Sequence, residues 1–216
     1  MELHETEDQQ LEAVKKWFNE NGRAILLGLI IGIGCVLGWN GWQNYKSTQA
    51  KEASDLFQEL LKTTDKDNPD SFLKLCERIK SDYPDSIYAS YAGFFQAKQQ
   101  VEAGKFEAAR KELESIVAES SDPSVKNIAR LRLLKILITE GKAEEALASI
   151  NTPGVSISGK FEAAYEEMKG DAQVALGRER EARGAYQRAV ELGRKSSLLD
   201  LKIEDLPAPS APELKQ

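Results

Sequence analysis

Three stretches of the sequence align with one another: VEAGKFEAARKEL (101–113), ITEGKAEEALASI (138–150) and VALGREREARGAYQRA (174–189). Each contains a glycine followed five residues later by an alanine, namely Gly104 and Ala109, Gly141 and Ala146, and Gly177 and Ala182. Successive glycines are 37 and 36 residues apart. A glycine can end a helix in a left-handed conformation, and a small residue beyond it lets the next helix pack closely. The pattern predicts three helix–turn–helix units in preference to a helical bundle with chance spacing.

A fourth helical unit is expected ahead of these three. A helix over residues 48–64 is followed by NPDSFLKLCERIKSDYPDS (68–86). Asn68 can cap the next helix, with Pro69 at its first position. That helix then carries an apolar stripe at helical spacing, formed by Phe72, Cys76 and Ile79.

Units of this size resemble tetratricopeptide repeats, whose period is about 34 residues. The usual small residue of the first helix corresponds here to Ala97, Leu134 and Gly170. Residues 166–193 come closest to the full pattern, through Gly170, Gly177, Ala182, Tyr186 and Ala189. Such repeats stack into a solenoid with a concave face suited to binding a peptide or protein. The predicted fold is all-α, with a tetratricopeptide-like helical-repeat solenoid over residues 43–206.

An apolar run precedes the repeats: residues 24–42 read AILLGLIIGIGCVLGWNGW, without a formal charge. At about 1.5 Å per residue a helix of this length spans about 28 Å, the thickness of a bilayer core. Aromatic residues suited to the membrane interface flank it, namely Trp17, Phe18, Trp39, Trp42 and Tyr45. A buried core helix would carry more polar residues, and a cleaved signal peptide would end in small residues. We predict a single, uncleaved transmembrane helix at 24–42 after an N-terminal segment at 1–23.

The basic residues on the two sides of this run give little information about its orientation across the membrane. Three basic residues precede it, and three follow within a similar distance: Lys15, Lys16 and Arg23, then Lys46, Lys51 and Lys62. The positive-inside count is therefore a tie. Arg23 lies closer to the apolar run than Lys46 does, which slightly favours a cytoplasmic N-terminus.

Small residues form two faces of the apolar helix. Ala24, Gly28, Gly32 and Cys35 share one face, and Gly34, Gly38 and Gly41 share another. Either face would let a second helix approach closely, although glycine is also common in membrane helices. We take four of these residues as candidate partner-binding positions: Gly28, Gly32, Gly34 and Gly38.

Aromatic residues gather in DYPDSIYASYAGFF (82–95). Five rings so close together make either a filled core or a partner groove, and core is the more ordinary alternative. Tyr88 and Tyr91 are the two expected to show an edge to solvent or to a ligand, so we add them to the candidate partner-binding residues.

Residue types that commonly act as catalytic groups or metal ligands, such as His and Cys, are scarce. The 216-residue chain has a net charge of −6 and no clustered Lys and Arg, so no nucleic-acid partner is expected. His4 is the single histidine. Cys35 and Cys76 are placed too differently to form a disulfide, and Cys76 is expected to be a small buried hydrophobe.

No catalytic, cofactor or metal site can be assembled from these residues. A nucleophile would need a nearby base, and the carboxylates Asp65, Asp67 and Asp70 follow no ligand motif. We therefore predict a binding protein that is not an enzyme and holds no cofactor. At the end of the chain, residues 198–206 are expected to dock partly on the last helices, and the Pro-rich residues 207–216 to form a flexible tail.

Taken together, the chain resembles the YfgM family of ancillary subunits of the bacterial Sec translocon. The resemblance is most specific in VKKWFNENGRAILLGLIIGIGCVLGWNGWQNY (14–45) and continues through the Gly-aligned units to LDLKIEDLP (199–207). It implies a single-pass protein of the inner membrane of a Gram-negative bacterium, with a cytoplasmic N-terminus and a periplasmic repeat domain. It carries over no catalytic residue.

The resemblance also implies partners and a role. The partners would be the SecYEG translocon, the periplasmic chaperone PpiD, newly translocated secretory proteins and membrane lipid. The role would be a non-enzymatic scaffold that links the channel to periplasmic chaperones and aids the handover of newly translocated proteins. The alternative is a general tetratricopeptide-type assembly factor for cell-envelope complexes without translocon contact.

Overall fold

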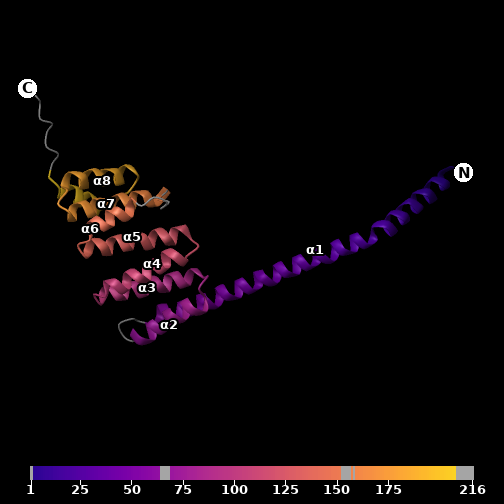
Figure 1. Cartoon of the computed structure of the whole chain (residues 1–216), viewed down its shortest axis with the longest axis horizontal. Coiled ribbons are helices and arrows are strands. Elements are labelled where there is room, and N and C mark those ends of the chain that lie inside the picture. Colours follow the sequence, from indigo (N-terminus) through magenta and orange to yellow (C-terminus); the bar gives the residue numbers. More distant parts are fainter. Residues whose placement is uncertain (1, 64–68, 152–156, 158, 208–216) are drawn as a thin grey trace, which may run out of the picture. The chain divides into compact units, whose positions relative to one another are not determined.

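The computed structural model describes residues 2–63, 69–151, 157 and 159–207, with the side chains of residues 2–10, 13 and 14 outside that description. The described elements are all helical and are shown in Figure 1. Their bounds are α1 Glu2–Lys62, α2 Pro69–Asp82, α3 Ile87–Glu102, α4 Phe106–Glu119, α5 Pro123–Thr139, α6 Ala143–Ile150, the short 3-10 helix η1 Gly159–Phe161, α7 Glu162–Ala175, α8 Glu179–Glu191 and α9 Ser197–Glu204. The chain divides into two compact units, residues 1–52 and residues 53–216. We call the second of these the repeat unit.

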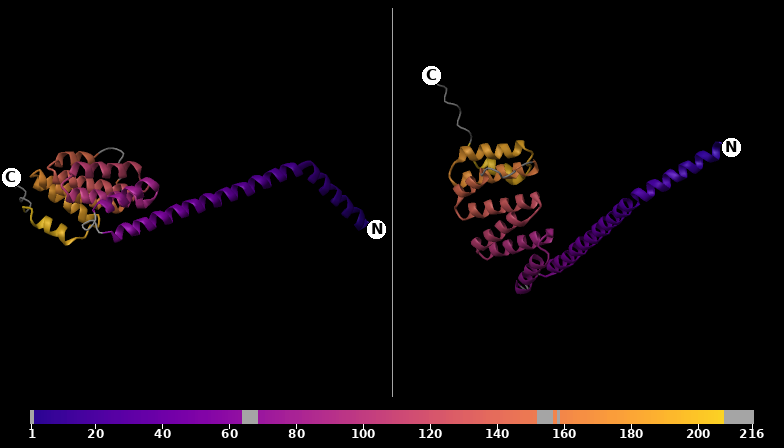
Figure 2. Two further views of the ribbon diagram at one scale, coloured as in Figure 1. Left: turned by 90° about the horizontal axis from the view of Figure 1, so that it is seen from below. Right: turned by 45° about the vertical axis from the view of Figure 1, so that its right-hand side comes forward.

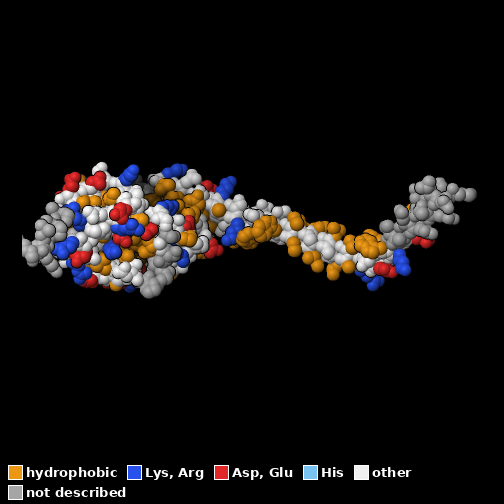
Figure 3. Space-filling model, turned by 90° about the horizontal axis from the view of Figure 1, so that it is seen from above, with side chains coloured by type: hydrophobic (Ala, Val, Ile, Leu, Met, Phe, Trp, Pro, Cys, Tyr) orange, Lys and Arg blue, Asp and Glu red, His pale blue; other side chains and the backbone are white. Residues whose placement is uncertain are grey.

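Helix α1 is continuous from Glu2 to Lys62. The two helices expected over residues 24–42 and 48–64 are therefore parts of one helix. Residues 43–47, which join them, contain neither proline nor glycine, so nothing in that stretch ends the helix. Among the described residues, α1 is the one helix long and apolar enough to cross a membrane. Figure 3 shows its apolar side chains as a band bounded by Lys and Arg.

Helices α2 to α8 pack in chain order as neighbours, as Figures 1 and 2 show. The three expected turns are present. Gly104, Gly141 and Gly177 have φ values of 71°, 77° and 70°, in the left-handed region that glycine adopts without strain. Each follows the end of a helix, so the predicted role of these glycines is confirmed.

The alanines of the repeat pattern lie where facing helices touch. Ala109, Ala146 and Ala182 are fully buried, which confirms their predicted packing role. The small positions of the first helices are buried as well. Gly170 is the tightest of these, because a Cβ there would overlap the ring of Tyr186 on α8.

The start of the repeat unit has its own apolar core. The predicted stripe of α2 is buried here, together with residues of α1 and α3, in a cluster of Leu60, Phe72, Cys76, Ile79 and Ala92. Burial raises the pKa of the Cys76 thiol to about 12, which confirms that this cysteine acts as a buried hydrophobe. Helix α2 begins at Pro69 as expected, and its proposed cap Asn68 lies outside the described residues.

Helix α9 closes the other end of the described repeats. Leu199 is fully buried and Leu206 nearly so, packed with Ala182, Tyr186 and Ala189 of α8. The docking expected for residues 198–206 is thereby confirmed. The tail expected after it lies outside the described residues from residue 208 onward.

Polar contacts fasten α9 as well. Lys202 Nζ donates to Glu167 Oε1 at 2.9 Å and to Asp171 Oδ1 at 2.7 Å, and Arg194 Nε donates to Glu167 Oε2 at 2.7 Å. Tyr186 donates its hydroxyl to Asp171 at 2.7 Å. The sequence did not indicate this network, because the hydrogen-bonded partners in it lie 15 to 35 residues apart.

Candidate functional site

Two neighbouring hollows lie along α3 and α5 in the repeat unit, and we call them together the α3–α5 groove. The larger has a volume of about 410 Å³ and is lined by Ala97, Lys98, Val101, Glu102, Phe106, Leu113, Arg132, Lys135, Ile136 and Thr139. The smaller has a volume of about 240 Å³ and is lined by Phe57, Tyr91, Phe94, Phe95, Lys98, Ile128 and Arg132. Lys98 and Arg132 belong to both, so the two cations stand where the hollows meet.

Capping residues set the register of both helices that form the groove. Ser86 begins α3 by accepting a hydrogen bond from the backbone N–H of Tyr88. Asp122 begins α5 by accepting one from the N–H of Ser124, with Pro123 at the first position. Where each helix begins decides which of its residues face the groove, and these include Lys98 on α3 and Arg132 on α5.

Arg132 lies over an aromatic ring of α3. The centre of its guanidinium is 4.3 Å from the centroid of the Phe94 ring. Partial burial against this ring lowers the pKa of Arg132, although the group stays charged at neutral pH. In the described part of the chain, no carboxylate lies within ion-pair distance of Arg132. Arg132 is thus held by contact with a ring, with no described carboxylate beside its charge.

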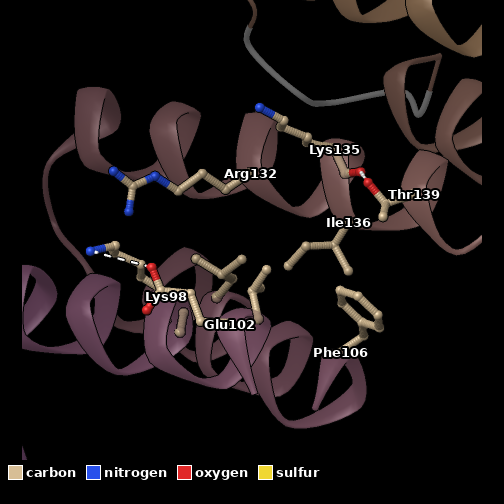
Figure 4. A pocket seen from close by; sticks show the side chains of 10 residues that line it. Lys98, Glu102, Phe106, Arg132, Lys135, Ile136 and Thr139 are labelled. Carbon is tan, nitrogen blue, oxygen red and sulfur yellow. Dashed lines mark hydrogen bonds and ion pairs between the residues drawn. The ribbon is translucent and has the colours of Figure 1, made fainter. Parts of the chain in front are cut away.

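Lys98 has a weak partner. Its Nζ lies 3.5 Å from Glu102 Oε1, one helical turn along α3, and both side chains are exposed. Exposed pairs of this kind contribute little stability and exchange readily. Figure 4 shows Lys98 and Arg132 at one end of the larger hollow, with Phe106 and Ile136 at the other. The groove therefore has an apolar floor and a locally positive edge, on a chain whose net charge is −6.

The smaller hollow is aromatic. The Phe57 ring lies 5.3 Å from Tyr88 and 5.8 Å from Tyr91 between centroids, and the two tyrosine rings meet edge to face at 6.3 Å. Tyr91 lines the hollow and is 37% exposed. Tyr88 lies behind it, half-buried, and belongs to the ring cluster without lining the hollow. The segment therefore contributes to both the core and the groove.

The four glycines proposed as partner-binding residues lie on α1 in the other unit. Gly28, Gly32, Gly34 and Gly38 are exposed, and a Cβ at any of them would meet nothing within 4 Å. Both small-residue faces are thus open among the described residues. Their role in binding a partner helix stays a prediction.

Groups of three or more His, Cys, Asp or Glu that could hold a metal ion do not occur among the described residues. Asp65 and Asp67 lie outside that part of the chain. The two cysteines are free thiols: Cys35 is exposed on α1 and Cys76 is buried. Binding by the described residues would therefore depend on surfaces such as the α3–α5 groove.

Sequence reasoning did not identify Lys98 and Arg132. One signal could have indicated Lys98: it and Lys135 lie 37 residues apart, the same interval as Gly104 and Gly141. Each directly follows the small position of its repeat, Ala97 or Leu134. A basic residue recurring with the structural period marks a position that repeats on one face of the stack. Arg132 has no counterpart at that interval, so the tertiary structure alone places it.

The fold and groove described above define a tetratricopeptide-like protein with an N-terminal apolar helix. In agreement, residues 15–208 match the family model described as a tetratricopeptide repeat-like domain. No solved structure is significantly similar to the chain.

Several curated proteins are similar over nearly their whole length. One from Escherichia coli (strain K12), named "Ancillary SecYEG translocon subunit", is 30% identical over 95% of this chain and 99% of its own length. Relatives of the same name from Haemophilus influenzae and Neisseria gonorrhoeae are 27% and 26% identical, over 93% and 95% of this chain and 97% and 100% of their own lengths. The chain belongs to the YfgM family, whose curated members are named ancillary SecYEG translocon subunits.

Proposed function

We propose that this protein is an accessory subunit of the Sec translocon, held in the bacterial inner membrane by α1. The observation that carries the proposal is the similarity to proteins of that name across nearly the full length of both chains, apolar helix and repeats together. A resemblance confined to the repeats would support only a binding module, since this fold serves many functions.

In the proposed arrangement, residues 1–23 are cytoplasmic, residues 24–42 span the membrane and residues 43–206 form the periplasmic domain. Arg23, next to the apolar run, supports this orientation weakly. The repeat domain then binds a periplasmic chaperone, which by family resemblance is PpiD, and aids the handover of newly translocated proteins. The protein acts as a scaffold and carries out no chemical step.

Membrane anchoring explains how a low binding affinity would be sufficient to hold a partner at the channel. A domain tethered beside the channel experiences a high effective concentration of whatever emerges there. Binding that would be too weak between free proteins is then enough to hold a partner during transfer.

The proposal is tested by purification of the tagged full-length protein from membranes solubilised in a mild detergent. We expect SecYEG and a membrane-bound periplasmic chaperone to co-purify with it. Recovery of the protein without channel subunits, but with other envelope complexes, would favour a general assembly factor. Recovery with no partner under conditions that keep SecYEG intact would contradict both functions.

The glycine faces of α1 make a second prediction. Replacing Gly34 with Leu, or Gly28 with Leu, adds bulk where a partner helix would approach, so we expect a several-fold loss of co-purified SecYEG. Leu29→Phe, on the same helix, is the matched control and should retain the channel. Equal recovery with all three variants would show that the channel contact lies elsewhere in the chain.

A further inference from the structure

The α3–α5 groove combines an apolar floor with three cations, of which Lys98 and Arg132 line both hollows, and this combination restricts what can occupy it. Val101, Phe106 and Ile128, which are half-buried or exposed, offer surface that gains from covering by apolar side chains. Arg132 is exposed and has no carboxylate partner among the described residues, and Lys98 has only an exposed one. An occupant that matches both features carries bulky apolar side chains and a carboxylate.

The position of the cations indicates where that carboxylate lies in the occupant. Lys98 and Arg132 line both hollows, so a chain that fills both must pass between the two cations. A chain that ended beside these cations in its terminal carboxylate would not continue from one hollow into the other. The arrangement therefore favours an acidic side chain within a continuous segment.

The same chain provides an internal precedent for this pairing. By the repeat period, Lys98, Lys135 and Asp171 are corresponding positions, each following the one before by 37 and 36 residues in turn. At Asp171, Lys202 of α9 donates to both carboxylate oxygens, at 2.7 and 2.9 Å. This position in the last repeat thus binds the opposite charge on another segment. In the first two repeats the position is basic, and the complementary segment would be acidic.

We infer that the α3–α5 groove binds an extended polypeptide segment in which an Asp or Glu lies between two bulky apolar residues, its carboxylate paired with Arg132 and Lys98. In an extended chain alternate side chains point the same way. The recognised pattern is therefore apolar–x–acidic–x–apolar, which spans about 13 Å. The geometry of the groove carries this inference independently of the proposed place at the translocon.

The test uses the full-length protein in lipid nanodiscs and fluorescent peptides with an amidated C-terminus. The probe is Gly-Ser-Phe-Ser-Glu-Ser-Leu-Ser-Gly, and binding is followed by fluorescence anisotropy. We expect replacement of its Glu by Gln or Lys to weaken binding roughly tenfold or more, since a charge-assisted hydrogen bond is lost. Replacing its Phe and Leu by Ala should weaken binding to a similar degree. Added salt should also weaken it.

Variants of the protein locate the site. Arg132→Gln should weaken binding roughly tenfold, whereas Arg188→Gln, which removes an exposed cation from α8, should not. Arg132→Glu should reverse the preference toward the Lys-containing peptide. Ile128→Ser should weaken binding, and Val190→Ser, an equally exposed apolar residue on α8, should not. Circular dichroism shows whether each variant keeps its helix content.

Three results would overturn the inference: equal binding of the Glu and Gln peptides, equal binding by Arg132→Gln and Arg188→Gln, or binding of the same probe with a free terminal carboxylate but not of the amidated probe. The last would identify a site for chain ends. None of these results bears on co-purification with SecYEG, so the two proposals can fail separately.

Discussion

Replacing Gly170 with Ala should destabilise the repeat unit by about 2 kcal/mol or more, although alanine is the better helix former by about 1 kcal/mol. The added Cβ would overlap the ring of Tyr186, which is itself buried and held by a hydrogen bond from its hydroxyl to Asp171 at 2.7 Å. Because the ring cannot turn away, α7 and α8 must move apart. Urea unfolding of the full-length protein, followed by circular dichroism, measures the change.

Gly184→Ala is the matched control, on helix α8. A Cβ at Gly184 meets nothing within 4 Å, so the substitution should be neutral or stabilising by up to about 1 kcal/mol. Tyr186→Leu provides the second control, since in its presence Gly170→Ala should cost less. Equal stability of Gly170→Ala and Gly184→Ala would contradict the close approach of α7 and α8.

Glu167→Gln should also weaken the fold, because it removes the charge at the centre of the α9 network. Glu167 is 5% exposed and faces two cations, Arg194 and Lys202. The expected loss is about 2–3 kcal/mol, below the roughly 3–5 kcal/mol seen for fully buried pairs, since both cations keep some contact with water. The matched control is Glu191→Gln, whose exposed pair with Arg188 should contribute about 0.5 kcal/mol or less.

The pH dependence gives this prediction a second measurement. Burial by itself raises the pKa of Glu167, but the hydrogen bonds and charges of Lys202 and Arg194 outweigh it and hold the pKa below its usual value. Burial likewise lowers the pKa of Lys202, and Asp171 and Glu167 outweigh it and raise the pKa. The sign of each shift sets the range over which it stabilises the fold.

A lowered carboxyl pKa stabilises the fold above the unfolded value, about 4.3, and the contribution is lost as the pH falls through the folded value. A raised lysine pKa stabilises the fold below about 10.4 and is lost as the pH rises through the folded value. The stability difference between the native protein and Glu167→Gln should therefore be largest between about pH 5 and 10 and shrink below about pH 4. A constant difference across this range would show that the network does not depend on charge.

Local signals explain why so much of the fold could be predicted. Gly104, Gly141 and Gly177 end helices through their own backbone conformation, which depends on the neighbouring residues alone. The buried alanines five residues later follow from the same period. Residues 24–42 and 48–64 were predicted as separate helices, and we did not predict that the residues between them, which contain no helix breaker, join the two into α1.

The candidate site was predicted less completely, for a physical reason. Tyr91 was identified from its aromatic neighbours, and it lines the groove. Arg132 lies 38 residues beyond Phe94, against which it packs, and an isolated arginine in a helix carries no mark of the ring it will cover. That no described carboxylate lies beside its charge becomes visible only when the neighbouring side chains are in place.

By itself, the sequence determined that this protein is helical, that its repeats turn at three glycines, and that an apolar helix long enough to span a membrane precedes them. Each of these features depends on consecutive residues or on one short period. Only the tertiary structure decided that α3 and α5 bring Lys98 and Arg132 to the junction of two apolar hollows, and that Lys202 returns from α9 to Asp171. These contacts depend on how successive repeats stack, and stacking places residues more than thirty positions apart within hydrogen-bonding or ring-contact distance.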